Sequence, residues 1–422
     1  MTVKKLIGKI HLWLGLASGL VVFILGITGC VWVFEEEIKS VVYKDRMFSD
    51  QQTSAQLPLA QLYENARNSL PTDMSIDRVM VYNNPKRTVM FRGSQPQENN
   101  EGIWYWNNRD FVFDAYFDPY TGKLKKLENR TFEFFMVVAA LHMTLLLDYE
   151  IGTTIVGISV LIFVITLITG LMLWWPKNKS AAKQRVWFRW KPTTKWKRKN
   201  YDLHNIAGFY MMFFALILAL TGLMWSFQWF SDGMKWIANG GKTIEVKQEK
   251  VASDTAYTSA QYPIDKVLRT LRQDFSEADM YFFVFPKKPS DPYTVFTFFE
   301  HNYDHIYSYF DQYTGKQLNQ IKFTDRDNGD KLKKMNFDIH TGKILGLPGK
   351  ILAFFASLVS ASLPVTGFLI WWSRRNKKRI MSTADAARKR KRPVKAGVHL
   401  NVKQPSHPKA AHVRPCIPSS SK

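Results

Sequence analysis

Cysteine and several common cofactor motifs are missing from this sequence, and their absence excludes some classes of protein. Among 422 residues there are two cysteines, Cys30 and Cys416. Cys30 lies in a long apolar stretch and Cys416 near the C-terminus, so we exclude a framework of disulfides. The sequence has no glycine-rich phosphate loop, no dinucleotide fingerprint and no zinc-type Cys/His spacing. A dedicated nicotinamide or flavin site is therefore not predicted.

Charged residues are also missing from four long apolar stretches, although the mean hydropathy of the chain is only −0.20. The stretches are 10–34, 151–175, 203–231 and 351–373. A bilayer core about 30 Å thick requires roughly 20 helical residues, so each stretch can cross it. The first is too long for a signal peptide and lacks a small-residue cleavage site, so we expect it to be retained. The sequence predicts four transmembrane helices in a lipid bilayer.

Acidic residues are nearly absent from three basic segments, 1–10, 176–203 and 374–422. Together these segments hold 28 basic and two acidic residues, whereas the rest of the chain holds 30 basic and 33 acidic residues. The net charge of +23 therefore comes from segments that a four-span protein places on one side of the membrane. By the positive-inside rule, both termini and the central loop are predicted to be cytoplasmic. Nucleic acid is not an expected partner.

The two long segments between spans are predicted to be small external α+β domains, at 35–141 and 232–339. Each begins with a helix-like stretch, continues through aromatic and β-branched strands, and reaches a turn with Asp before Tyr-Thr-Gly. The helices are predicted at 59–63 and 264–268, the strands at 79–82 and 281–285, and the turns at 116–123 and 309–316. The other predicted parts are the N-terminus with the first span (1–34), an external His segment with the second span (142–175), a cytoplasmic loop (176–202), the third span (203–231), a second His segment with the fourth span (340–373) and a disordered basic tail (374–422).

The membrane part of the chain is repeated. One set of residues in the first span recurs in the third at a constant offset of 193: His11, Gly15, Thr28, Gly29 and Trp32 correspond to His204, Gly208, Thr221, Gly222 and Trp225. The second and fourth spans share another ending, Thr169-Gly170 before Trp174-Trp175 and Thr366-Gly367 before Trp371-Trp372. The fold class predicted is an α-helical membrane protein, with a four-helix bundle formed by a tandem two-helix repeat.

Four histidines occupy repeated positions at the ends of the spans. His11 and His204 open the first and third spans at the cytoplasmic boundary, and His142 and His340 precede the second and fourth on the external side. They form two pairs at two levels of the membrane. Two axial imidazoles from facing helices are the ligands of a six-coordinate haem b, so we predict two haem b groups.

Small residues accompany each predicted haem. Gly15 and Gly208 lie one turn after a histidine, where the missing side chain admits a flat macrocycle. The Thr-Gly steps of the first and third spans lie 17 residues from the histidine, roughly 25 Å along the helix and level with the external pair. Those of the second and fourth spans lie level with the cytoplasmic pair. Ordinary close helix packing also favours such steps, so they have two compatible interpretations.

Two details qualify the histidine prediction. A straight helix would lift His142 about 13 Å above the second span, so we expect a short helix that bends back at 148–152, with 346–349 as the matching break after His340. His301 and His305 have strand-like neighbours, and a strand separates them by about 13 Å. They are predicted to be surface histidines, with contact to an iron chelate as the alternative.

Several motifs resemble those of a known family. They are His11-Leu12-Trp13-Leu14-Gly15, Leu141-His142 with Leu145-Leu146-Leu147, Thr169-Gly170 through Trp174-Trp175-Pro176, His204 with Gly208, and the two Asp-x-Tyr-Thr-Gly turns. The order of these motifs and their duplication are specific. By them, the chain from Lys4 to Arg375 resembles the PepSY-associated transmembrane family, which includes bacterial inner-membrane ferric-siderophore reductases. His340 departs from the pattern, since it lacks the Leu-His-x-x-Leu-Leu context of His142.

The resemblance implies two periplasmic PepSY-like domains, a di-haem bundle, and reduction of an Fe(III)-siderophore or other Fe(III) chelate in the periplasm. Reduction releases Fe(II), and the electrons come from a donor that the sequence does not identify. Two alternatives remain open. One is a non-catalytic sensor or protease regulator that uses its PepSY-like domains for binding. The other is an iron-chelate permease, although no charged residue lies within the spans to mark a midplane site.

Overall fold

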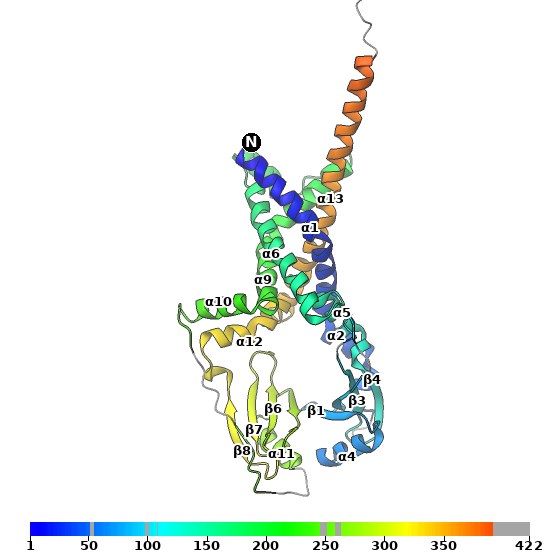
Figure 1. The fold of residues 1–422 in the computed structure, drawn as a ribbon, viewed down its shortest axis with the longest axis vertical. Coiled ribbons are helices and arrows are strands. Elements are labelled where there is room, and N and C mark those ends of the chain that lie inside the picture. Colours follow the sequence, from blue (N-terminus) through cyan, green and yellow to red (C-terminus); the bar gives the residue numbers. More distant parts are fainter. Residues whose placement is uncertain (51–54, 98–100, 108, 245–250, 258–262, 391–422) are drawn as a thin grey trace, which may run out of the picture. The chain divides into compact units, whose positions relative to one another are not determined.

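The computed structural model describes residues 1–50, 55–97, 101–107, 109–244, 251–257 and 263–390 (Figure 1). The chain divides into two compact units, Met1–Trp372 and Ser373–Lys422. The first unit contains the four membrane helices and a β-sheet. Their arrangement follows the order of the elements along the chain, because each half runs from a span through a sheet segment to a second span.

In the described ranges, four helices are long and apolar enough to cross a membrane, as predicted. They are α1 (Val3–Trp32), α6 (Tyr149–Trp174), a composite of α8 (Trp196–Asp202), the π-helical η2 (Leu203–Ala207) and α9 (Gly208–Ser226), and the first part of α13 (Gly346–Arg390). Their contacts use small residues: a Cβ atom on Gly26 of α1 would lie 2.7 Å from Ala361 Cβ of α13. Close backbone approach of this kind is how apolar helices gain packing contacts in lipid.

Two predicted boundaries of the membrane part are wrong. The third span ends at Ser226, not at residue 231, because Phe227 adopts an extended backbone and a new helix, α10 (Gln228–Ala238), follows. The Phe227 ring lies where a side chain at Gly157 would be, which holds it against α6. The tail predicted to be disordered from residue 374 continues the α13 helix to Arg390, since alanine, lysine and arginine favour helix. The rest of the tail, 391–422, lies outside the described residues.

The two α+β segments form one antiparallel sheet with the strand order β4-β3-β2-β1-β5-β6-β7-β8. The strands are β1 (Ser75–Tyr82), β2 (Val89–Gln95), β3 (Phe111–Phe117), β4 (Leu124–Asn129), β5 (Met280–Val284), β6 (Tyr293–Phe298), β7 (Ile306–Phe310) and β8 (Gln317–Ile321). The halves join through β1 and β5, where Met80 pairs with Phe282. This pairing satisfies two strand edges that separate domains would leave open. The structure therefore differs from the prediction of two separate domains.

One hydrophobic core serves both halves of the sheet. Helices α4 (Leu59–Ser69) and α11 (Ile264–Asp274) pack on the same core, which includes Leu62, Phe117, Leu271 and Phe283. The Asp265 carboxylate at the start of α11 accepts the backbone N–H of Leu59 at 2.6 Å, so it caps the helix of the other half. The predicted helices, strands and turns of both segments are present.

Shorter elements connect the sheet to the spans. They are α2 (Glu35–Val42), α3 (Lys44–Met47), η1 (Arg130–Phe132), α5 (Phe134–Thr144), α7 (Lys179–Arg185), η3 (Phe323–Asp325), α12 (Asn328–Thr341) and η4 (Lys343–Leu345). The bends predicted after His142 and His340 exist. The first lies slightly earlier than expected, because Leu145 and Leu146 have positive φ and Asp148 caps α6. At the second, Gly342 and Gly346 have positive φ, which glycine adopts without steric strain.

Candidate functional site

The structure brings the four predicted histidines together as two facing pairs. His11 on α1 and His204 on η2 form the tail-side pair, with ring centroids 6.4 Å apart. His142 on α5 and His340 on α12 form the sheet-side pair, with centroids 6.1 Å apart. Each pair joins the two halves of the duplicated chain.

These separations suit two imidazoles that share one metal ion. A metal–nitrogen distance of roughly 2 Å, with the size of the ring, places the centres of two opposed imidazole ligands about 6 Å apart. Among the residues that the structure describes, no group of three or more His, Cys, Asp or Glu side chains could hold a metal ion. Two imidazoles are too few for a bare ion. The donor set fits a metal whose other ligands belong to a macrocycle.

Each histidine is held by the threonine of a Thr-Gly step on the other span of its own half. The Nδ1–Oγ1 distances are 3.1 Å for His11 and Thr169, 2.9 Å for His142 and Thr28, 2.8 Å for His204 and Thr366, and 2.8 Å for His340 and Thr221. The Thr-Gly steps therefore lie at the two levels predicted for them.

The hydroxyl geometry fixes the tautomer of these histidines. Each threonine hydroxyl donates its one hydrogen to the carbonyl four residues earlier in its helix, as from Thr28 to Ile24 at 2.7 Å and from Thr221 to Ile217 at 2.7 Å. The same contact occurs at the other two sites. The oxygen is then an acceptor for the imidazole, so Nδ1 carries the proton and the Nε2 lone pair is available to a metal.

Burial keeps the sheet-side imidazoles neutral. It lowers the pKa of His142 to about 4 and that of His340 to about 3, and the neighbouring His142 adds to the shift of His340. A neutral imidazole is the form that binds a metal. At pH 7 neither ring needs to lose a proton before it acts as a ligand.

The glycine of each Thr-Gly step gives the ring its space. A Cβ atom would lie 3.2 Å from the histidine Cε1 at Gly170 and Gly367, 3.5 Å at Gly29 and 3.6 Å at Gly222. A Cβ atom would crowd the imidazole at Gly170 and Gly367 and would be in ordinary contact with it at Gly29 and Gly222. These steps are therefore sites of close packing, and the group that they contact is the histidine. Gly15 has open space where a Cβ atom would lie, whereas at Gly208 that atom would be 3.1 Å from Leu363.

A cavity of about 410 Å³ adjoins the sheet-side pair. Its lining includes His142, His340, Gly29, Gly222, Trp32 and Trp225, and the remainder is mainly apolar. The volume lies within the range of cofactor sites, and the apolar walls with two nitrogen donors suit a flat hydrophobic ligand. Trp225 stands edge-on to His340 with centroids 5.1 Å apart, which forms one wall.

Two buried asparagines, which were not predicted from the sequence, hydrogen-bond to the Thr-Gly steps in the second half of the chain but have no counterpart in the first half. Asn200 and Asn336 each lie four residues before a histidine, and their Nδ2 groups donate at 3.1 Å to the carbonyls of Thr366 and Thr221. Both are almost fully buried, and the Oδ1 of each has no hydrogen-bond partner among the residues that the structure describes. The equivalent first-half residues are Ile7 and Val138. This difference between aligned positions was the signal that could have revealed them.

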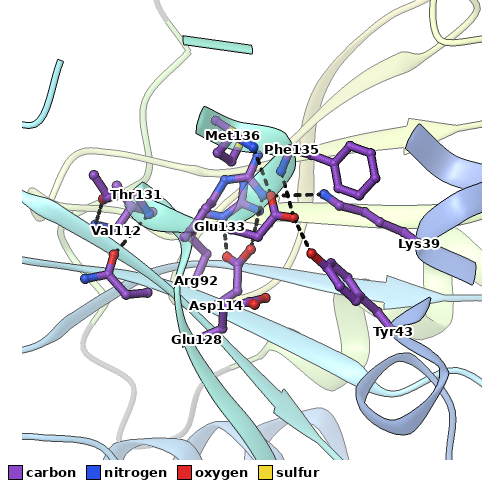
Figure 2. Close-up of polar contacts among 12 residues, drawn as sticks. Lys39, Tyr43, Arg92, Val112, Asp114, Glu128, Thr131, Glu133, Phe135 and Met136 are labelled. Atoms are coloured by element: carbon purple, nitrogen blue, oxygen red, sulfur yellow. Dashed lines mark hydrogen bonds and ion pairs between the residues drawn. The ribbon is translucent and has the colours of Figure 1, made fainter. Parts of the chain in front are cut away.

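A buried polar network fixes the helix that carries His142 (Figure 2). Glu133 caps α5 by accepting the backbone N–H of Phe135 at 3.1 Å, and it also accepts the hydroxyl of Tyr43 at 2.8 Å. Tyr43 follows α2, which begins three residues after span α1. The beginning of α5 is thus tied to the end of the first span, which limits movement of His142.

The remaining histidine pair does not join the site. His301 and His305 lie in the loop between β6 and β7, not within a strand as their neighbours suggested. The Nδ1 of His305 contacts the carbonyl of Asn302 at 2.6 Å, and His301 stacks on Tyr303. Their local partners are consistent with structural roles.

These features define a membrane protein with a duplicated four-span bundle. The chain belongs to the PepSY-associated transmembrane family: the family model, described as the PepSY-associated TM region, matches residues 9–374. The family expected from the motifs is thereby confirmed. No curated protein matches the chain.

Proposed function

We propose that the two histidine pairs hold two haem b groups and that the protein carries electrons across the membrane. The observation that supports this most directly is the facing of imidazoles at 6.4 and 6.1 Å with each Nδ1 engaged by a threonine. Haem supplies reversible one-electron chemistry at its iron. The threonines of this chain would orient the four histidines that hold the haem, with the Nε2 atom of each imidazole free to bind the iron.

The repeat gives a reason for two sites at opposite sides of the bilayer. Helix α1 carries His11 of one site and Thr28 of the other, 17 residues apart, and α9 continues the third span in the same way from His204 to Thr221. At ~1.5 Å per residue, the two levels are separated by about 25 Å. Two redox groups at these levels would divide the apolar barrier into shorter steps.

We propose further that the protein lies in the bacterial inner membrane with its termini in the cytoplasm. The basic tail-side segments support this orientation by the positive-inside rule. The sheet then lies in the periplasm, where an Fe(III)-siderophore or another Fe(III) chelate takes one electron and becomes the Fe(II) chelate. A donor outside this chain supplies that electron. Fe(II) binds hard oxygen ligands more weakly, so reduction releases the iron.

The test is a reduced-minus-oxidised visible spectrum of the detergent-purified chain from haem-replete cells. We expect two bis-histidine haems per chain, both reduced by dithionite, and reoxidation when an Fe(III) chelate is added. His301→Leu is a matched control outside the site and should keep both haems. A monodisperse protein without any tetrapyrrole would overturn the cofactor assignment. Stable reduced haem in the presence of Fe(III) chelates would overturn the substrate assignment alone.

A further inference from the structure

Helix α10 has an exposed aromatic face. Trp229, Trp236 and Ile237 are 63%, 52% and 63% exposed. Their spacing of seven and eight residues places them on one side of an α-helix. Gly233 lies on the same side with open space around it. An 11-residue helix thus presents an apolar stripe that the described part of this chain does not cover.

The opposite side of α10 is fastened to α12. Lys235 Nζ pairs with Asp330 at 2.8 Å, and the Asn239 side chain accepts the backbone N–H of Gly329 at 2.7 Å. Ser231 on this side is buried. Because these contacts fix the rotation of the helix, the aromatic face cannot turn inward.

The position of α10 is that of a membrane surface. A single residue, Phe227, separates α10 from the end of the third span at Ser226. Figure 1 shows α10 running sideways from the end of α9, at a steep angle to that helix, instead of continuing along it. An amphipathic helix that leaves a span in this direction lies at the boundary between headgroups and acyl chains.

A second aromatic surface occurs beside the start of the second span. Trp104 and Trp106 stack with centroids 5.7 Å apart and are 47% and 38% exposed, next to Ile103 at 54%. Backbone hydrogen bonds hold this loop on the α5–α6 connection: Tyr105 donates to the carbonyl of Leu146 at 2.8 Å. The loop therefore lies at the same end of the spans as α10.

We propose that these two surfaces, the exposed side chains of 103–106 and of α10, are immersed in the lipid interface on the sheet side of the membrane. Helix α10 follows the third span after one residue, and the 103–106 loop is hydrogen-bonded to the connection that leads into the second span. Both surfaces therefore adjoin the ends of spans. Tryptophan favours this zone because it combines an apolar ring with a polar N–H. The surfaces belong to different halves of the chain, which suits a surrounding bilayer better than a single protein partner.

This contact also has a consequence for the candidate site. Helix α12 carries His340 and is fastened to α10, while the 103–106 loop is bonded to the end of α5, the helix of His142. Lipid that fixes the depth of the two surfaces also fixes the depth of both sheet-side histidines. The inference itself requires no haem and stands apart from the proposed function.

The test uses the full chain in lipid nanodiscs, with Cys30→Ala and Cys416→Ser as background. Single cysteines replace Ile237, Ile103 or, as control, Leu318, an exposed apolar residue of β8 at 38% exposure. Each is labelled with an environment-sensitive fluorophore. We expect blue-shifted emission at 237 and 103, strongly quenched by lipids that carry a nitroxide near the headgroup, and water-like emission at 318.

The outcomes separate the possible partners. Water-like emission at both 237 and 103 in a monodisperse protein would overturn the proposal. A second result would also overturn the proposal: blue-shifted emission that nitroxide lipid does not quench, in discs that hold two copies of the chain. That result would assign the surface to contact with a second copy. Because 237 and 103 are exposed, neither cysteine disturbs packed residues, and either position tests the inference if the other variant expresses poorly.

Discussion

Replacing Asn336 by valine introduces the residue that the first half has at the equivalent position, Val138. The substitution removes the hydrogen bond from Asn336 Nδ2 to the Thr221 carbonyl, 3.1 Å long. It also removes a buried Oδ1 that has no partner within the described part of the chain. Asn336 is 2% exposed, so water does not reach it freely. The two losses have opposite effects on stability.

The magnitudes determine the sign. A neutral hydrogen bond contributes about 1 kcal/mol net, whereas a buried acceptor without a partner costs about 1–3 kcal/mol. Thr221 lies inside α9, so its carbonyl retains its helical hydrogen bond. The two valine methyls add buried apolar surface. We therefore expect Asn336→Val to stabilise the protein by about 1 kcal/mol, although it deletes a visible hydrogen bond.

Thr221→Val should have the opposite effect at the same site. It is nearly isosteric, but it removes the acceptor of the His340 imidazole, 2.8 Å away, and leaves a buried N–H without its partner. The expected cost is about 1–3 kcal/mol. The two variants can be compared directly because both place a valine in the cluster around Thr221. Asn336→Val removes a buried acceptor without a described partner, whereas Thr221→Val leaves the buried N–H of His340 without one.

The assay is thermal unfolding of the detergent-purified chain without added ligand. For a chain of this size, 1 kcal/mol corresponds to a shift of about 1–3 °C, upward for Asn336→Val and downward for Thr221→Val. Asn68→Val, at an exposed position of α4, is the matched control and should shift the transition little. If Asn336→Val lowers the transition as Thr221→Val does, Oδ1 has a partner in the protein, and the reasoning about an uncompensated acceptor is refuted.

Three further predictions concern the site and the sheet. His11→Leu should remove the tail-side haem spectrum and leave the sheet-side one, because the pairs share no ligand; loss of both would contradict independent sites. Thr28→Val should weaken haem retention at the sheet-side pair by about 10–100-fold, measured by haem transfer to an acceptor protein, since it removes the partner that orients His142; unchanged retention would contradict this role. Burial tends to raise the pKa of Asp311, but backbone N–H donors such as Thr314 at 2.8 Å outweigh it and lower the pKa. A carboxyl with a depressed folded pKa stabilises above its unfolded value near 3.8 and loses this effect as pH falls through the folded pKa. Asp311→Asn should therefore cost about 2 kcal/mol at pH 7 and less in acid, followed by circular dichroism; an equal cost at both pH values would contradict the assignment.

The asymmetry between the halves is informative because the duplication provides its own comparison. In the first half, α5 is capped by Glu133, which also accepts the hydroxyl of Tyr43 at the end of α2 (Figure 2). In the second, α12 is capped by Asp327, whose side chain accepts the N–H of Asp330. Both halves secure the helix of the sheet-side histidine by a carboxylate cap, but with different neighbours. The common feature is a carboxylate that fixes the first turn of the helix, whereas the other residues that contact this carboxylate differ between the halves.

The sequence by itself determined the features that depend on local pattern. Apolar stretches of sufficient length predicted four spans, and a constant offset of 193 predicted the duplication and the equivalence of His11 with His204. The strands and turns of both sheet segments also followed from alternation and from Asp and Gly at turn positions. Such signals are read from the order and spacing of residues along the chain, so no knowledge of packing was required.

Only the tertiary structure decided how distant residues meet. Thr28 and His142 are 114 positions apart, and Thr169 and His11 are 158 apart. Their pairing depends on how two helices are rotated about each other. Small differences in packing determine this rotation, and the local sequence pattern does not contain it. The joining of β1 to β5 and the roles of Asn200 and Asn336 have the same origin, since each arises from a contact between halves or spans that the linear sequence leaves open.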